Sequence, residues 1–234
     1  MRFVWEMVKQ GLELAGSDGA LAATLWRTLW LAVVSTVIAL ALGLPLAIVL
    51  SERESRTRRA GLVVANAGLG LPPVVLGVYV ALALTPGAAL GSLGWTNTIQ
   101  AIVLAQVLLA LPIVVALTAT AVRGLPTGLL DQARAFGASR LAVGALALRE
   151  ARVGVTAAVI TALGSAVAEV GAVVIVGGNM RMQTNTLAST ILLDLAAADP
   201  AAATGDLLVL GAVVLVLGVG LTAVQHGHRP KGAP

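Results

Sequence analysis

The sequence predicts an all-α integral membrane protein with about five transmembrane helices. Of its 234 residues, 58% are hydrophobic and only 11% are charged, whereas soluble domains carry about 25% charged residues. The mean hydropathy is +0.96, and several uncharged apolar runs exceed the roughly 18 residues that mark a membrane-spanning helix. These observations exclude an ordinary soluble enzyme, a disordered chain and a nucleic-acid-binding domain.

Five apolar runs are bounded by charge clusters, and each has the length of a transmembrane helix. About 20 to 25 residues at 1.5 Å per residue cross a hydrocarbon core of about 30 Å. The runs are rich in Ala, Leu, Val and Gly, and small residues let helices approach closely, which favours a packed bundle. The alternating segments of about ten residues that build a transmembrane barrel do not occur. The predicted spans cover residues 29–50, 60–84, 99–122, 153–176 and 207–224.

The distribution of positive charge predicts the orientation of the bundle. Most of the fifteen Lys and Arg residues lie after the first span, after the third span or in the C-terminal tail, and only four lie elsewhere. The positive-inside rule therefore places the N-terminus outside and the C-terminus in the cytoplasm. The cytoplasmic cations are Arg53, Arg56, Arg58, Arg59, Arg123, Arg134, Arg140, Arg149, Arg152, Arg229 and Lys231; those outside are Arg2, Lys9, Arg27 and Arg181.

Three regions of the chain are expected to differ in organisation. Residues 1–27 form an amphipathic segment at the outer interface, or alternatively a mobile surface arm. This segment is not a signal peptide, because Glu6, Lys9 and Glu13 interrupt its apolar core. Residues 28–225 form the transmembrane domain, with a cytoplasmic link at 123–152, and residues 226–234 form a disordered tail. Within this domain, residues 187–198 are apolar but too short to span, which indicates a re-entrant or interfacial helix.

The link at 123–152 is too polar to cross the membrane and too regular for a passive loop. Pro126 and the glycines punctuate it, the piece up to Phe136 is rich in helix formers, and Gly137 is placed to cap that helix. A second short helix is expected over 140–148. Two short helices at an angle form a projection that another protein can bind. The alternative is an amphipathic surface loop.

The motif Asp131-Gln132-Ala133-x-x-x-Gly137 resembles the coupling motif of the permease subunits of bacterial ABC importers. In that family the motif reads Glu-Ala-Ala, three residues, then Gly, and its helix docks into a cleft of a separate ATPase subunit. Gln132 departs from the first alanine, and Arg149-Glu150 stands where many members have Leu-Pro. By this resemblance, the coupling residues are Asp131, Gln132, Ala133, Phe136, Gly137, Ala138 and Ser139.

Glu169 is the one ionisable residue well inside a predicted span. A carboxyl group at that depth costs several kcal/mol or forces protonation, which makes a functional role the first hypothesis. The alternative is structural: Glu169 caps or hydrogen-bonds a neighbouring helix within the bundle.

The stretch from Glu169 to Ala172, followed by Gly177-Gly178-Asn179 and Gln183-Thr184, resembles the permeases for tungstate and, more distantly, those for molybdate. The resemblance extends over nearly the whole chain and implies import of an oxyanion, tungstate first and molybdate second. Amide, hydroxyl and guanidinium donors suit such an anion because conduction needs weak, multiple contacts; the alternative is that these are solvated loop residues. The candidate pathway residues are Glu169, Asn179, Arg181, Gln183 and Thr184, with Asn185, Thr96, Asn97, Thr98 and Gln100 in support.

Two proline-containing stretches interrupt the predicted spans. Residues 68–73 break the second span and Leu111-Pro112 the third, and such breaks serve as pathway linings, as gating bends or as simple packing kinks.

The sequence carries no recognisable motif for catalysis or for ATP binding. It has no cysteine, no histidine within a predicted span, and no Gly-x-x-x-x-Gly-Lys-[Ser/Thr] loop, since its only lysines are Lys9 and Lys231. It is therefore expected to be a transport subunit and not an enzyme, with no catalytic residue, metal or cofactor.

The resemblance implies a homodimer, two ATPase subunits that hold ATP and magnesium, and an external substrate-binding protein. A secondary transporter would show inverted repeats and several embedded charges, and a membrane enzyme a catalytic cluster.

Overall fold

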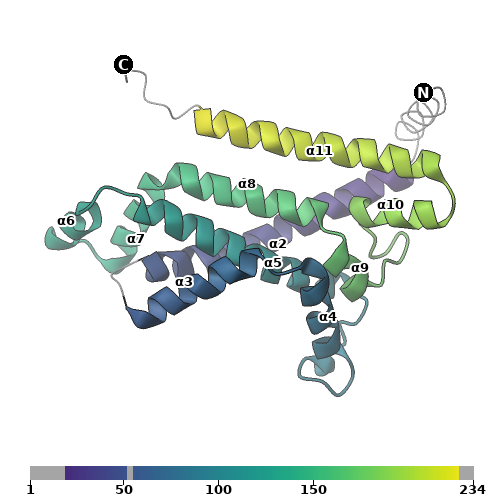
Figure 1. Cartoon of the computed structure of the whole chain (residues 1–234), viewed down its shortest axis with the longest axis horizontal. Coiled ribbons are helices and arrows are strands. Elements are labelled where there is room, and N and C mark those ends of the chain that lie inside the picture. Colours follow the sequence, from purple (N-terminus) through teal and green to yellow (C-terminus); the bar gives the residue numbers. More distant parts are fainter. Residues whose placement is uncertain (1–18, 52–54, 227–234) are drawn as a thin grey trace.

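The computed structural model describes residues 19–51 and 55–226, and every regular element in these ranges is helical, which confirms the predicted class (Figure 1). The predicted N-terminal segment falls largely, and the tail almost wholly, outside the described residues. The helices are α2 (Gly19–Ser51), α3 (Arg56–Leu69), α4 (Pro73–Leu84), the 3-10 turn η1 (Gly91–Leu93), α5 (Ile99–Arg123), α6 (Leu129–Ala135), α7 (Arg140–Glu150), α8 (Arg152–Ala168), α9 (Gly171–Gly177), α10 (Leu187–Ala196) and α11 (Pro200–His226).

The prediction of about five spans holds only when two bent helix pairs are each counted as one span. Three of the described helices, α2, α5 and α11, are long and apolar enough to cross a membrane alone. The pairs α3–α4 and α7–α8 pass the same test together, although they bend by 106° and 77°. The first span is also longer than expected, because α2 begins at Gly19 and not near residue 29.

Two predicted spans differ from the structure in their continuity. The fourth, at 153–176, is not one helix, because α8 ends at Ala168 and α9 starts at Gly171. Conversely, Pro112 does not interrupt the third span, since it lies inside the unbroken helix α5. The bend in the second span falls where it was expected, between Gly70 and Pro72.

The centre of the bundle is the parallel pair α2 and α5, against which α8 packs in the opposite direction. Ala39 of α2, Val114 of α5 and Ala162 of α8 are completely buried together. A Cβ atom at Gly43 would lie 2.7 Å from Cγ1 of Val114. Because small residues line this seam, the helix backbones approach closely without needing a hydrophobic driving force from water.

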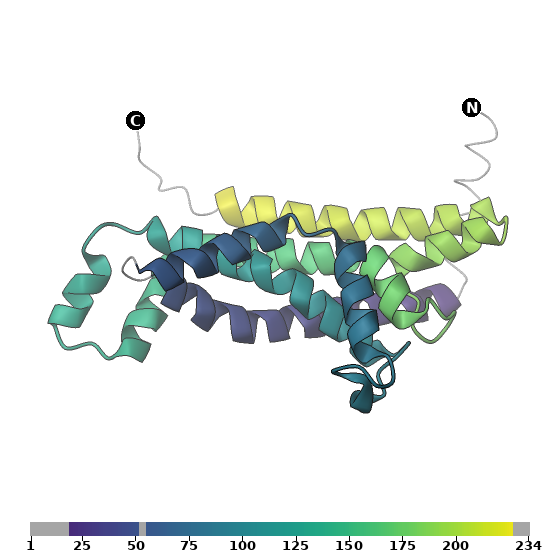
Figure 2. The ribbon, with the colours of Figure 1, turned by 60° about the horizontal axis from the view of Figure 1, so that its bottom comes forward.

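The ends of the bundle differ in charge. The start of α3, the end of α5 and the α6–α7 hairpin lie together at one end, and α2 starts at the opposite end (Figures 1 and 2). Most described arginines belong to that first end, while Arg27 and Arg181 belong to the other. The helix α11 finishes at the arginine-rich end, as an odd number of crossings requires (Figure 1).

The α2–α5 seam predicts a size limit at Gly43. We expect Gly43→Leu to destabilise the protein by about 1–3 kcal/mol, because the added side chain overpacks against Val114. The control is Gly218→Leu in α11, because a Cβ atom added to Gly218 would have no atom of another helix within 4 Å. The measurement is the thermal midpoint of each purified variant in detergent; equal midpoints for the two variants would contradict close packing at this seam.

Candidate functional site

The α6–α7 hairpin, called here the elbow, is shaped by two glycines with left-handed backbone. Gly128 (φ 86°) precedes α6, and Gly137 (φ 85°) follows it. The N–H of Ala138 donates to the carbonyl oxygen of Ala133 at 3.0 Å, and the N–H of Gly137 donates to that of Arg134 at 3.0 Å. These two bonds form a Schellman motif, which needs a positive φ at Gly137. The expected helix cap at Gly137 is confirmed.

The tip of the elbow presents apolar side chains to the surroundings. Phe136 is 90% exposed and Leu141 is 88% exposed. Ser139 starts α7 by accepting the N–H of Ala142 on its hydroxyl oxygen at 3.2 Å. Two large apolar side chains so close together and so exposed outside the apolar part of a bundle indicate a protein contact.

The acidic position of the coupling motif is accessible. Asp131 accepts a hydrogen bond from Arg134 at 2.8 Å within the same short helix, and its side chain remains 60% exposed. Gln132 is exposed as well, whereas Ala133 and Ala138 are half-buried. The structure therefore gathers all of the predicted coupling residues on one projecting hairpin (Figure 2).

The base of the elbow is joined firmly to the bundle. Val122 of α5 packs with Ala147 of α7 and with Ala151 at the start of α8, and all three are buried. A cavity of about 250 Å³ lies between the elbow and the ends of α2 and α5. The elbow is therefore in direct packing contact with the ends of α5 and α8.

The break between α8 and α9 is held by polar side chains from other helices. Gln106 of α5 donates through Nε2 to the carbonyl oxygen of Ala166 at 3.0 Å and accepts the Ser35 hydroxyl of α2 at 2.9 Å. The Ala166 carbonyl belongs to the last turn of α8, where intrahelical partners run out. Gln106, which is only 2% exposed, thus ties α2, α5 and α8 together at the break.

Glu169 lies in the break itself. It is 8% exposed, and its Oε1 accepts the N–H of Ala172 in the first turn of α9 at 2.9 Å. This is the structural alternative raised from the sequence, in which Glu169 caps a helix inside the bundle. A carboxylate at a helix start also interacts favourably with the helix dipole.

The loop 178–186, which carries most of the predicted pathway residues, has an unusual backbone. Gly178, Asn179 and Met182 have positive φ values of 69°, 46° and 65°. The carbonyl oxygen of Met180 accepts the N–H groups of residues 183, 184 and 185 at 2.9–3.2 Å. Asn97 lies against this loop, since a Cβ atom on Gly178 would sit 3.0 Å from its amide carbon.

Most of the polar side chains predicted to line a pathway are used to hold this loop. The hydroxyl of Thr184, which is buried, donates to the Gly177 carbonyl oxygen at 2.6 Å and accepts the N–H of Met180 at 2.9 Å. Asn179 donates to the Ser189 carbonyl oxygen at 3.2 Å. Gln183, in contrast, is exposed.

Arg27 of α2 fixes the loop and was not singled out from the sequence. Its Nη1 donates to Oδ1 and to the carbonyl oxygen of Asn185 at 2.7 and 2.9 Å, and its Nη2 donates to the Met182 carbonyl oxygen at 2.9 Å. Thr28 adds an acceptor for the N–H of Leu187 at 2.9 Å. The missed signal is that Arg27 interrupts an otherwise apolar run, where an arginine requires a specific set of partners.

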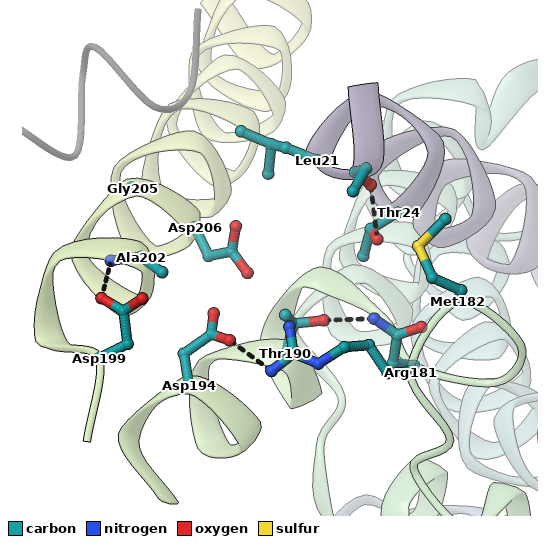
Figure 3. Close-up of a pocket in the computed structure, with 12 residues that line it drawn as sticks. Leu21, Thr24, Arg181, Met182, Thr190, Asp194, Asp199, Ala202, Gly205 and Asp206 are labelled. Carbon is teal, nitrogen blue, oxygen red and sulfur yellow. Dashed lines mark hydrogen bonds and ion pairs between the residues drawn. The ribbon is translucent and has the colours of Figure 1, made fainter. Parts of the chain in front are cut away.

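Arg181 lies in an acidic surrounding. Its Nη2 lies 2.7 Å from Oδ1 of Asp194, a residue only 4% exposed. Figure 3 shows this pair in a cavity of about 430 Å³ between α2, α10 and α11, which Asp199 and Asp206 also line. Three carboxyl groups and one guanidinium make this cavity unsuited to an anion.

The Glu169 geometry predicts different effects for two substitutions. Glu169→Gln keeps an acceptor oxygen for the Ala172 N–H and should change stability only slightly, whereas Glu169→Ala leaves that buried N–H unpaired and should cost about 1–3 kcal/mol. The thermal midpoints in detergent measure both. If Glu169→Gln is as unstable as Glu169→Ala, the charge and not the cap holds the break.

Comparisons with known proteins agree with this geometry. The model of the family described as binding-protein-dependent transport system inner membrane components matches residues 39–231. A probable anion ABC transporter permease protein of Haloferax volcanii is 34% identical over 209 residues, covering 87% of this chain and 88% of its own. A tungstate uptake system permease protein, TupB of Peptoclostridium acidaminophilum, is 28% identical and covers 99% of this chain and 100% of its own.

A solved structure shares the fold. The bacterial alginate ABC transporter, determined in complex with an alginate pentasaccharide-bound periplasmic protein, matches with a TM-score of 0.72 at 16% identity, over 93% of this chain and 82% of its own. Because the family model covers most of the chain, the chain belongs to the inner-membrane components of binding-protein-dependent transport systems, the permease subunits of ABC importers.

Proposed function

We propose that this permease imports a tetrahedral oxyanion, in the first place tungstate, from an external binding protein into the cytoplasm. The assignment of the substrate rests on two relatives: the tungstate permease that aligns with this chain over its full length, and the anion permease that is 34% identical. Molybdate is the second candidate, because the two dianions have nearly the same size and charge. Selection between them is expected in the binding protein.

The observation that carries the mechanism is the projecting elbow. It combines a capped helix, the exposed Phe136 and a firm junction with α5 and α8. Such a shape suits docking into a cleft of an ATP-hydrolysing subunit, whose closure would push on both helices. The coupling residues are accordingly Asp131, Gln132, Ala133, Phe136, Gly137, Ala138 and Ser139.

The orientation follows from the charge of the two ends. The elbow end collects most of the described arginines, and the positive-inside rule assigns it to the cytoplasm. The opposite end, with the loop 178–186 and α10, then faces the binding protein. The alginate transporter, whose structure includes a periplasmic protein, supports this kind of partner.

The exposed face of α8 supports a position along the translocation path. Thr161, Ser165 and Ala168 are exposed on it, and small or polar residues are typical of helix faces that contact protein within a membrane. The exposed residues of α2, such as Val33 and Val37, are bulky and apolar instead. Two copies of the chain, packed with these α8 faces toward each other, would enclose a polar path.

The residues predicted to line the pathway have different roles in this proposal. Gln183 is exposed at the outer end and can offer its amide to the anion. Asn179, Thr184 and Arg181 shape the outer loop through their internal bonds. Glu169 is buried against the Ala172 N–H, so it shows little charge to a passing oxyanion.

Uptake by the reconstituted transporter tests the substrate. The permease, the ATPase and the binding protein are placed in liposomes, and ATP-dependent accumulation of tungstate, molybdate and sulfate is measured. We expect accumulation of tungstate, with molybdate as its strongest competitor. Accumulation of an amino acid or a sugar without any oxyanion would overturn the proposal.

Substitution at the elbow tests the coupling role. We expect Phe136→Ala to leave insertion and thermal midpoint unchanged, because the side chain is exposed, but to reduce ATP-driven uptake at least tenfold through loss of a contact anchor. Leu215→Ala is the control, since Leu215 is 68% exposed on α11, away from the elbow. Normal uptake by the Phe136 variant would exclude this residue as an anchor for the ATPase.

A further inference from the structure

The bend between α7 and α8 forms a basic groove that lies outside the proposed coupling residues. The groove has a volume of about 310 Å³ and is lined by Arg149, Glu150, Arg152 and Val153. It lies at the end of α7 remote from the elbow tip, about 14 Å along the helix from Ser139 at 1.5 Å per residue. None of the proposed coupling residues, Asp131 to Ser139, lines it.

Both arginines of the groove are available for a ligand. Arg149 and Arg152 are exposed, and in the described part of the chain neither guanidinium pairs with a carboxylate, not even with Glu150 beside them. Two guanidinium groups against one carboxylate leave a net positive charge in the groove. The planar donor fork of arginine matches the oxygen atoms of a tetrahedral anion.

The groove also lies at the start of α8, whose far end is the Glu169 break. Thr161 and Ser165 are exposed polar residues in the half of α8 nearer that break, whereas Val153 and Ala157, nearer the groove, are apolar and half-buried. In the proposed direction of transport, an anion that passes along α8 reaches the two arginines last.

From this placement we infer that Arg149 and Arg152 form a binding site for a tetrahedral oxyanion at the inner mouth of the path. The inference rests on the proposed function for its direction of transport. Rings of basic side chains select anions in pores, provided that binding is weak enough to permit release. Glu150 in the same groove limits the net charge and so favours release.

A lipid phosphate has the same chemistry as a free oxyanion, so the test must separate the two sources. The assembled transporter without its binding protein is purified in neutral detergent, and tungstate binding is measured by isothermal titration for the wild type and for the double variant Arg149→Gln, Arg152→Gln. Arg59→Gln is the matched control, because Arg59 is an exposed arginine at the same end of the bundle. Native mass spectrometry of each protein with added phosphatidylglycerol reports bound lipid.

We expect tungstate binding to weaken at least about tenfold in the double variant and to remain unchanged in the Arg59 control. Loss of bound phosphatidylglycerol from the double variant, with tungstate binding unaffected, assigns the same oxyanion site to a lipid headgroup. If the double variant keeps both ligands, or loses the ATPase on purification, the inference is overturned. Uptake by the wild type, measured in the same preparation, distinguishes this failure from failure of the proposed function, because wild-type uptake of tungstate does not depend on the groove variants.

Discussion

The structure depends on one constraint: in lipid, each backbone N–H and C=O group must find a partner within the protein. This chain interrupts its helices inside the apolar part of the bundle, and each interruption exposes such groups. At the α8–α9 break, Gln106 binds the Ala166 carbonyl oxygen and Glu169 binds the Ala172 N–H. At the α3–α4 bend, the N–H groups of Gly70 and Leu71 turn back to the carbonyl oxygens of Ala67 and Gly68. The buried side chains of Gln106 and Glu169 therefore bind backbone groups, and these bonds occupy the polar atoms that a substrate would need.

The sequence predicted those features that local chemistry determines. Apolar length and bounding charge were enough for the existence of the spans and for the arginine-rich end. The elbow was predictable to within a residue or two, since Pro126, Gly137 and Ser139 are turn and cap residues whose backbone preference does not depend on distant contacts. The bend at Gly70–Pro72 was visible for the same reason, because prolines at the start of a helix prevent its continuation from the preceding turn.

Features set by contacts between distant segments were not predictable. At the α8–α9 break the local signals are Gly171, which starts α9, and Glu169, which caps it; the bond from Gln106 of α5 to the Ala166 carbonyl oxygen comes from a distant segment and has no local signal. Pro112 shows the converse: it is compatible with a continuous α5, and it packs against Gly68, where a Cβ atom would lie 2.7 Å from the proline ring. Arg27 is bonded to Asn185, which lies 158 residues away, and no pattern near Arg27 specifies that partner. The charge of Arg181 likewise looked available for an anion until the structure placed it on Asp194.

These distant contacts also determine how the two ends of the bundle are connected. At the arginine-rich end, α5 packs through Val122 against the elbow. At the opposite end, Ile102 packs with Leu84 of α4 and with Val173 of α9 in a separate cluster. Because α5 is one continuous helix of 25 residues, it joins these two clusters directly, whereas α8 ends at the Glu169 break and does not continue into α9. In the proposed coupling role, a displacement of the elbow would therefore be carried to α4 and α9 by α5, while α8 would move separately from α9 at the break.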